Sequence, residues 1–522
     1  MALQLTCYGA VGEIGGNKIL LEDGRARILL DFGTPFARQQ RFFNEFLRPR
    51  AARGLLDPLA LGLLPPLAGL YREDLALPGL WARFSSHPFY RELRREGPPV
   101  DAVLLSHAHL DHNGDLSYLD PSIPVYCTRA TGMVARAMQD TGQDTFEREL
   151  VYLRPRANKE GNLVSDTKAP LQQRLFHFLD GPLSEPARAF WCSAPGRRLL
   201  ASCGGGQAPQ ELAGLRLRWW AVDHSVPGAC AFAIETSCGW LAYTGDLRFH
   251  GRQGPATWRA AEALAALRPL ALLCEGTHVD AQGCTAEADV AQNVGRLLRE
   301  AAGRLVVADF APRNVERLET FLALCRAHGR VLLIQPKDAY LLEALHLAEP
   351  AAHPDPLAER ALMLYDDPKA APRPWETNLR TRWQSKLVSA SAVCQHRGDF
   401  VLCFSLWDTN DLLDLEGIEG GFYIYSNSKA YDEEQEADLE RLRNWVDHCG
   451  LSFHGDPRSG DGPPLHSSGH ASGQDLVRFV LAVRPRYLIP IHSERPEWWQ
   501  EQLAGSGVEV LLPQAGVTLE LG

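Results

Sequence analysis

The residues best suited to chemistry lie in one short stretch, 107–112, with the sequence HAHLDH. It supplies three imidazoles and one carboxylate, the ligand types that zinc and similar divalent ions take in proteins. One ion rarely takes four ligands from so few residues, so the stretch predicts two neighbouring ions that share it. The alternative is a polar loop with chance histidines, but crowding these groups against a buried strand is costly without a metal.

A short apolar run, 102–105, precedes this stretch and has the length and composition of a buried strand. The ligand spacing of i, i+2, i+4 and i+5 does not fit one helical face. It predicts an extended loop at the strand end, turning at Asn113 and Gly114, because alternate side chains of extended backbone point the same way. Asp31 ends the strand 26–31, where a supporting hydrogen bond is expected. The glycine-rich segment 12–17 leads into a strand and predicts a turn.

Other ligand-type residues also end predicted strands. Strands 215–222 and 230–236 bracket His224, the strand that begins at Leu241 ends at Asp246, and the strand 487–491 ends at His492. Beyond residue 252, apolar runs alternate with helix-like segments such as 287–300 and 314–328. Strand–helix alternation predicts a parallel sheet with helices on its faces, inserted into the first domain.

The composition is that of an ordinary globular protein with room for two or three domains in its 522 residues. Apolar runs fall short of the roughly 20 residues that span a membrane, and the N-terminus predicts no secretory signal. Twelve cysteines without a C-x-x-C pair predict reduced thiols and a cytoplasmic protein. The net charge of −11 argues against nucleic-acid binding, although a local basic stripe can still bind phosphates.

Two stretches, 35–99 and 154–198, look like insertions. The first carries nine aromatic residues with arginines between them. A small helical subdomain is favoured there over a surface that stacks bases and binds phosphates.

The stretch 107–112, with its strand-end partners, resembles the signature of the metallo-β-lactamase fold, an αβ/βα sandwich with a metal site at its rim. The late motif SGHAS at 468–472, Arg484-Pro485 and the segment 489–492 resemble the β-CASP branch of that superfamily, which consists of nucleases, and ribonuclease J most of all. The implied fold class is α/β, with an inserted parallel-sheet domain. The expected divisions are 1–255 and 431–522 for the metallo-β-lactamase domain and 256–430 for the β-CASP domain.

The resemblance implies a role for each matching residue. It assigns one zinc ion to His107, His109 and His224, a second to Asp111, His112 and His492, and a bridging position to Asp246. Glu275 matches the acidic motif that opens the β-CASP insertion, and His470 matches the histidine of the middle motif. His466 and Ser468 match positions that bind substrate near the scissile or 5′ phosphate.

The resemblance further implies a metal-dependent nuclease that hydrolyses phosphodiester bonds of RNA, or of single-stranded DNA, as an exonuclease or an endonuclease. Two zinc ions, with manganese as the alternative, are expected to activate a hydroxide, with Asp111, Glu275 and His470 as catalytic residues. His470 is the expected general acid and Glu275 orients it. Arg313, Arg317 and Lys429 are candidates for gripping the nucleic acid.

RNA is favoured over DNA as the partner, and a homodimer stays open. A small-molecule hydrolase of the same fold, such as a lactonase or thioesterase, is the alternative enzyme, and a non-catalytic scaffold is a third hypothesis. Two features depart from the ribonuclease J pattern. The segment 35–99 is larger, and the sequence stops at Gly522 where those proteins usually carry a further domain.

Overall fold

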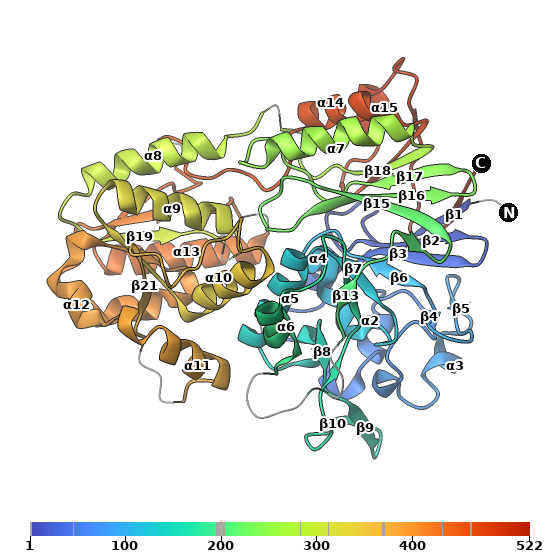
Figure 1. Ribbon diagram of the computed structural model, residues 1–522, viewed down its shortest axis with the longest axis horizontal. Coiled ribbons are helices and arrows are strands. Elements are labelled where there is room, and N and C mark those ends of the chain that lie inside the picture. The colour runs from blue at the N-terminus through green and yellow to red at the C-terminus, as the bar shows by residue number, and fades with distance from the viewer. Residues whose placement is uncertain are drawn as a thin grey trace. The chain divides into compact units, whose positions relative to one another are not determined.

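The computed structural model describes residues 3–44, 46–194, 200, 204–281, 283–311, 313–367, 371–430, 432–459 and 462–522 (Figure 1). The chain forms two compact units. The first comprises Met1–Phe249, Gln253–Gly283 and His470–Gly522, and the second comprises His250–Arg252 and Cys284–Gly469. The limits of the second unit differ from the limits 256 and 430 that the sequence predicts for the β-CASP domain. Those domain limits stay a prediction.

The first unit contains two large sheets. Among the described residues the first sheet has eight strands in the order β13 (Gly206–Gln207), β12 (Phe176–Phe178), β7 (Val125–Cys127), β6 (Ala102–Leu104), β3 (Ala26–Phe32), β2 (Lys18–Asp23), β1 (Leu3–Cys7) and β28 (Thr518–Leu521). Strands β3, β6, β7 and β12 run parallel, so their carboxyl ends share one edge.

In the described part of the chain the second sheet has seven strands, in the order β14 (Glu211–Leu212), β15 (Leu215–Ala221), β16 (Cys230–Thr236), β17 (Gly239–Tyr243), β18 (Ala271–Glu275), β26 (Tyr487–Ile491) and β27 (Glu509–Val510). Strands β17, β18 and β26 are parallel neighbours, although β26 follows β18 by more than two hundred residues. Their carboxyl ends therefore also meet at one edge.

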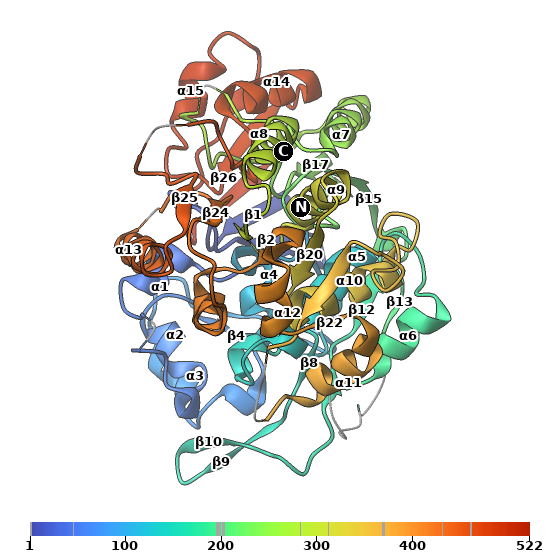
Figure 2. The ribbon, with the colours of Figure 1, turned by 90° about the vertical axis from the view of Figure 1, so that its left-hand side faces the viewer.

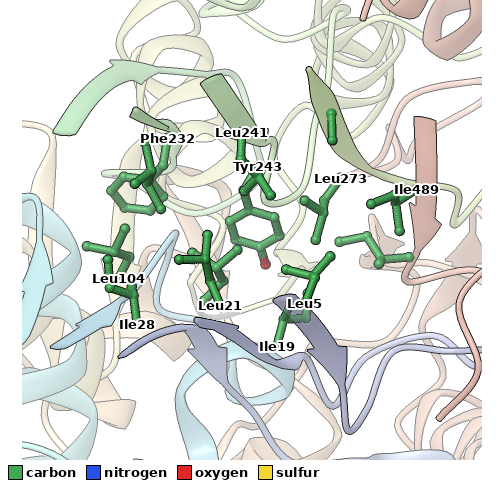
Figure 3. Close-up of a cluster of buried hydrophobic side chains, with 14 of the residues drawn as sticks. Leu5, Ile19, Leu21, Ile28, Leu104, Phe232, Leu241, Tyr243, Leu273 and Ile489 are labelled. Atoms are coloured by element: carbon green, nitrogen blue, oxygen red, sulfur yellow. The ribbon is translucent and has the colours of Figure 1, made fainter. Parts of the chain in front are cut away.

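The hydrophobic core of the first unit lies between these two sheets (Figure 3). Leu5, Ile19 and Leu21 from the first sheet face Phe232, Leu241 and Leu273 from the second, and all six side chains are buried. Alternate residues of each strand point into this layer, as expected for strands with one face on the core. The ring of Tyr243 also lies in this layer, with its hydroxyl directed toward the first sheet.

Three helices cover the outer face of the second sheet: α7 (Gly254–Leu267), α14 (Gly473–Val483) and α15 (Trp498–Gln502) (Figure 1). Leu264, Phe479 and Trp499 from these helices pack on Leu272 and Leu488. Two sheets with helices on the outside form the αβ/βα sandwich that the sequence predicts. The other helices of this unit are α1 (Phe36–Gln40), α2 (Leu56–Ala60), α3 (Leu80–Phe84), α4 (Leu110–Asn113), α5 (Arg129–Thr141) and α6 (Glu185–Cys192).

The two insertions fold as short elements. Segment 35–99 contains α1, α2, α3 and the two-residue strands β4 (Leu67–Ala68) and β5 (Arg91–Glu92), which pair in parallel. Tyr71 and Trp81 stack in its interior at 6.0 Å between ring centroids. The second insertion contains the hairpin β9 (Arg156–Lys159) and β10 (Asn162–Ser165), the strand β11 (Gln172–Gln173) and α6. Strand β11 pairs with β8 (Tyr152–Leu153), which lies just before the insertion.

The second unit is built on one sheet of strands that all pair in parallel. Its order, in the residues described, is β22 (Leu387–Val388), β21 (Leu362–Tyr365), β20 (Val331–Ile334), β23 (Phe400–Cys403), β19 (Val306–Asp309), β24 (Phe422–Tyr425) and β25 (Ser452–His454). Around it lie α8 (Glu287–Glu300), α9 (Val315–Ala327), α10 (Pro336–Ala348), α11 (Pro374–Arg382), α12 (Ala390–Gln395) and α13 (Glu433–His448) (Figure 2). This is the inserted parallel-sheet domain of the predicted fold class.

The cysteines depart from the expectation that all are reduced. Among the described residues ten cysteines are free thiols, whereas Cys192 is disulfide-bonded. No helix in the described ranges is long and apolar enough to span a membrane.

Candidate metal centre

Several of the predicted site residues lie at the carboxyl ends of strands in both sheets of the first unit. His107 follows β6, Asp246 follows β17, Glu275 is the last residue of β18, and His492 follows β26 directly. His470 lies just before α14, whose start is fixed because the Ser472 hydroxyl caps it by accepting from the Asp475 amide. The chain thus brings residues from 107 to 492 to one site.

The stretch 107–112 differs locally from its predicted form. It is extended only as far as His109, and Asp111 and His112 belong to the single helical turn α4. The i, i+2 pair therefore shares one side of extended backbone, whereas the helical turn sends the next two ligands to a neighbouring position. The prediction of an extended loop up to Asn113 is wrong for this half.

Two groups of ligand atoms result. In the first, Nδ1 of His109 lies 3.2 Å from Nε2 of His107 and 3.0 Å from Nε2 of His224. In the second, Nε2 of His492 lies 3.3 Å from Oδ2 of Asp111, and Nε2 of His112 lies 4.0 Å from the same oxygen. One ligand atom from each residue of a group lies within 4.8 Å of all the others.

Asp246 stands between the two groups. Its Oδ2 lies 3.5 Å from Nε2 of His107 and 3.2 Å from Nε2 of His112, and its Oδ1 lies 3.8 Å from Nε2 of His492. Both carboxylate oxygens are buried and have no hydrogen-bond partner among the described residues, and the same holds for Nε2 of His112. Such atoms are costly to bury unless a cation contacts them. The donor set, imidazole and carboxylate, fits zinc.

The outward nitrogens of three ligands are held by hydroxyls and a carboxylate. Nδ1 of His112 donates to Oδ2 of Asp31 at 2.6 Å, and Nδ1 of His107 lies 3.0 Å from the Ser106 hydroxyl. Nδ1 of His492 lies 2.9 Å from the Thr277 hydroxyl. Each contact places the ring proton on Nδ1 and turns Nε2 toward the ligand cluster, as is common for metal-binding histidines.

Asp31 is itself tied into the core between the sheets. It accepts hydrogen bonds from the Ser106 amide and hydroxyl, each at 2.7 Å, and from the hydroxyl of Tyr243. The side-chain amide of Asn17 donates to that tyrosine oxygen at 2.9 Å. Asp31 has a φ of 55°, an uncommon conformation for a residue other than glycine, which this network holds in place.

The buried Glu275 and the half-buried His470 form a pair beside the ligands. Nδ1 of His470 lies 3.0 Å from Oε2 of Glu275 and 3.9 Å from Oδ2 of Asp246. The Thr277 hydroxyl donates to the same Glu275 oxygen at 2.6 Å, and the Leu247 amide donates to Oε1 at 2.5 Å. Both oxygens of the Glu275 carboxylate thus have hydrogen-bond partners, and the carboxylate fixes the orientation of the His470 imidazole.

The charges of the site are strongly coupled. Burial and the neighbouring His112 hold the pKa of His107 well below its usual range, and burial and His109 do the same for His224. Burial also disfavours the charged form of His470, but the carboxylates of Glu275 and Asp246 outweigh it and raise its pKa to about 9. The surroundings therefore favour the charged form of His470 and the neutral forms of His107 and His224.

The structure brings together His107, His109, Asp111, His112, His224, Asp246, Glu275, His470 and His492. His466 and Ser468 belong to the second unit, where Nδ1 of His466 contacts the Ser426 carbonyl at 3.2 Å and the Ser468 carbonyl contacts Nε2 of His250 at 2.9 Å. Arg317 is buried against Glu287 and Ser426, so the prediction that it grips nucleic acid is wrong.

Four supporting residues were not predicted from the sequence: Asn17, Tyr243, Thr277 and Arg248. Arg248 pairs with Asp223 at 2.9 Å and thereby fixes the backbone next to His224. For Thr277 a signal was present, because it lies only two residues beyond Glu275 in the same strand-end motif.

Comparisons with known proteins agree with this site. A family model described as a beta-lactamase superfamily domain matches residues 76–157, and one described as a Zn-dependent metallo-hydrolase RNA specificity domain matches residues 464–513. The first match contains the stretch 107–112, and the second contains His470 and His492.

The chain is similar to proteins named ribonuclease J. It is 24% identical to that of Corynebacterium glutamicum over 99% of this chain and 58% of the relative, and 23% identical to that of Sinorhizobium meliloti over 93% and 68%. Its identity to that of Mycolicibacterium smegmatis is 35%, over 63% of this chain and 43% of the relative. The chain thus spans only part of these relatives.

A solved structure of a protein of unknown function from Enterococcus faecalis V583 has the same fold. Its TM-score is 0.69 at 21% identity, and the match covers 100% of both chains. Together with the two matched domains and the relatives along most of its length, the observed sandwich with its inserted parallel sheet makes the chain a ribonuclease J-like protein of the β-CASP branch of the metallo-β-lactamase superfamily.

Proposed function

We propose that the chain is a metal-dependent nuclease that hydrolyses phosphodiester bonds of RNA. The observation that carries this proposal is the position of His470, whose Nδ1 lies 3.0 Å from Oε2 of Glu275, beside two groups of metal-type ligands that share Asp246. The family description of the segment 464–513 as an RNA specificity domain favours RNA over single-stranded DNA.

In this proposal His107, His109 and His224 hold one zinc ion, Asp111, His112 and His492 hold a second, and Asp246 serves both. When bound, two such ions lower the pKa of water and stabilise negative charge on the phosphate. The chain's part is to fix the ligands: Asp31, Ser106 and Thr277 hold three imidazoles so that Nε2 faces the site.

The departing 3′ oxygen of the RNA needs a proton, and His470 supplies it. Its Nδ1 faces Glu275, so Nε2 is the atom from which the proton leaves. Glu275 keeps the imidazolium charged before the reaction and orients the ring, since its other contacts to Thr277 and Leu247 leave it little freedom. After product release, the ring regains its proton from water.

A time course on 5′-labelled single-stranded RNA, single-stranded DNA and a generic ester tests the proposal. The wild type is compared with Asp111→Ala, with zinc or manganese added back. Metal-dependent cleavage of RNA that the variant has lost is the expected result, and the fragment ladder separates exonuclease from endonuclease action. Hydrolysis of the ester alone by a metal-loaded wild type would instead assign a small-molecule hydrolase.

A further inference from the structure

A pocket rich in arginine lies in the first unit away from the metal centre. Its volume is about 550 Å³, within the range of small-molecule sites. The residues that line it are Gln4, Glu22, Gly24, Arg25, Arg27, Arg94, Arg95 and Glu520. Four guanidinium groups against two carboxylates give it a local charge of +2 on a chain whose net charge is −11.

One wall of the pocket is a row of polar residues across four neighbouring strands. Glu520 on β28 pairs with Gln4 on β1, which pairs with Glu22 on β2, which pairs with Arg27 on β3. The strand neighbours of these residues, such as Leu5, Leu21 and Ile28, are in the core, so the row faces the opposite side of the sheet.

The other wall comes from the insertion 35–99. Arg94 and Arg95 follow β5, and Arg95 is anchored there by Asp101 at 2.7 Å and by the Pro98 carbonyl at 2.6 Å. Arg27 is the second residue of β3, and Asp31, which contacts His112, lies four residues further along the strand. At the rise of a strand this is about 13 Å, toward the opposite end of the sheet. The pocket is therefore separate from the ligand cluster.

Not all of the arginine charge is neutralised within the protein. Glu22 is engaged by Arg91 at 2.9 Å and by Arg27 at 3.4 Å. The exposed Arg94 has only a distant partner, Glu92 at 3.9 Å, and no ion pair to the Arg25 side chain occurs among the described residues. Arg25 and Arg94 are thus the two guanidinium groups of the pocket that are able to take an anion.

We infer that this pocket binds a nucleotide, either free or as part of a nucleic-acid strand. Arg25 and Arg94 present planar forks that match phosphate oxygens. Glu520 and Gln4, joined by a hydrogen bond of 3.3 Å, add an acceptor and an amide for the hydroxyl and amino groups of a ribose and a base. A simple anion would contact only the two guanidinium groups, whereas a nucleotide also has groups that match Glu520 and Gln4. That the nucleotide comes from RNA rests on the proposed function, but the binding itself does not.

The test compares the full-length wild type, Arg25→Ala/Arg94→Ala and the control Arg259→Ala, which removes one exposed arginine from α7. Calorimetry with adenosine 5′-monophosphate and with inorganic phosphate measures the free ligand. Anisotropy with a short labelled phosphorothioate RNA, at about 50 to 200 mM salt, measures the strand.

The double variant is expected to bind the nucleotide about tenfold more weakly or worse, because two charge-assisted contacts are lost. If strands bind here, the slope of log affinity against log salt falls by about 1.4 for two lost phosphate contacts on a single strand. Weakening for the mononucleotide alone assigns the pocket to free nucleotide.

Equal affinity of the double variant, the control and the wild type for every probe would overturn the inference. RNA cleavage by the same wild-type preparation is scored separately. A failure of the proposed nuclease activity and a failure of nucleotide binding at the pocket are therefore distinguishable results.

Discussion

Thr277 and Glu275 link two histidines that have different tasks. The threonine hydroxyl lies 2.9 Å from Nδ1 of His492 and donates to Glu275, whose same oxygen lies 3.0 Å from Nδ1 of His470. His492 turns its other nitrogen to the ligand cluster, and His470 is the proton donor of the proposed mechanism. One hydroxyl and one carboxylate therefore orient both a metal ligand and an acid.

For His470→Ala we expect both metal ions to stay bound while turnover falls by about 10² to 10⁴, the usual contribution of a general acid. The reason is that no ligand atom is removed, only the proton donor. Metal analysis and an RNA cleavage assay on the same sample check this, with the exposed His87→Ala as control. A matching loss of bound metal would show that His470 is a ligand instead.

Thr277→Val removes the hydroxyl that holds His492 and keeps the shape of the side chain. We expect metal affinity to fall about 10- to 100-fold, as for other residues that orient a ligand from behind. Competition with a chromophoric chelator measures it. Thr277→Ser keeps the hydroxyl and should recover most of the affinity, and failure of this recovery would indicate a packing role only.

At the scale of the elements, the backbone of α4 packs directly against Gly33. A Cβ atom at Gly33 would lie 1.7 Å from the Asp111 carbonyl oxygen and 2.4 Å from the His112 amide, so the backbone of this helical turn rests directly on the end of β3. The Asn17 amide donates to the Asp111 carbonyl at 3.0 Å, and the Thr34 amide donates to the Leu110 carbonyl at 2.8 Å. These contacts fix the direction of Asp111 and His112.

Gly33→Ala should push α4 away, with a loss of stability of about 1–3 kcal/mol, which is typical of overpacking, and a loss of the second ligand group. Urea denaturation and metal titration measure the two effects. Gly206→Ala is the control, since its Cβ would meet only Nδ1 of His177 at 3.6 Å. Full metal binding by Gly33→Ala would contradict the docking argument.

The sequence predicted the sandwich, the parallel-sheet insertion and α8 with the bounds 287–300 that the structure has. The sequence also predicted the residues that the structure gathers at the metal centre. Several of them stand out because they are polar residues at the ends of apolar runs, whereas His470 was found only through the resemblance of its motif to ribonuclease J. The sequence did not predict that Tyr243 contacts Asp31, which is 212 residues away. That contact depends on how the two sheets face each other, and strand patterns do not encode this register. The helical turn α4 depends likewise on the glycine beneath it.

At the scale of the whole molecule, the second unit carries carboxyl groups that are hard to ionise. Asp309 ends β19 and is 2% exposed, and burial raises its pKa to about 7 against the hydrogen bond of 2.7 Å from Tyr423. Burial likewise raises the pKa of Asp338 to about 7. Between the unfolded value of 3.8 and about 7 the folded chain binds more protons than the unfolded chain. Asp309 therefore lowers stability as the pH rises through this window.

Comparison with Asp309→Asn isolates this effect, since the amide stays neutral. Relative to the variant, the wild type should lose stability from pH 5 to pH 8, as measured by urea midpoints at each pH. Other titrating groups cancel in the difference. A difference that does not change with pH would mean that Asp309 is ionised throughout, or protonated throughout.

The position of β26 has a consequence for the order of synthesis. β26 fills the place beside β18, with Ile491 opposite Glu275, yet 284–469 are made between them. At about 5 to 20 residues per second this interval lasts roughly 10 to 40 s on the ribosome. Until then the edge of β18 is unpaired, which invites strand-to-strand aggregation, and His492 is missing from the site. The nascent chain is thus both incomplete as a metal site and in need of protection by chaperones until residues 487–492 emerge.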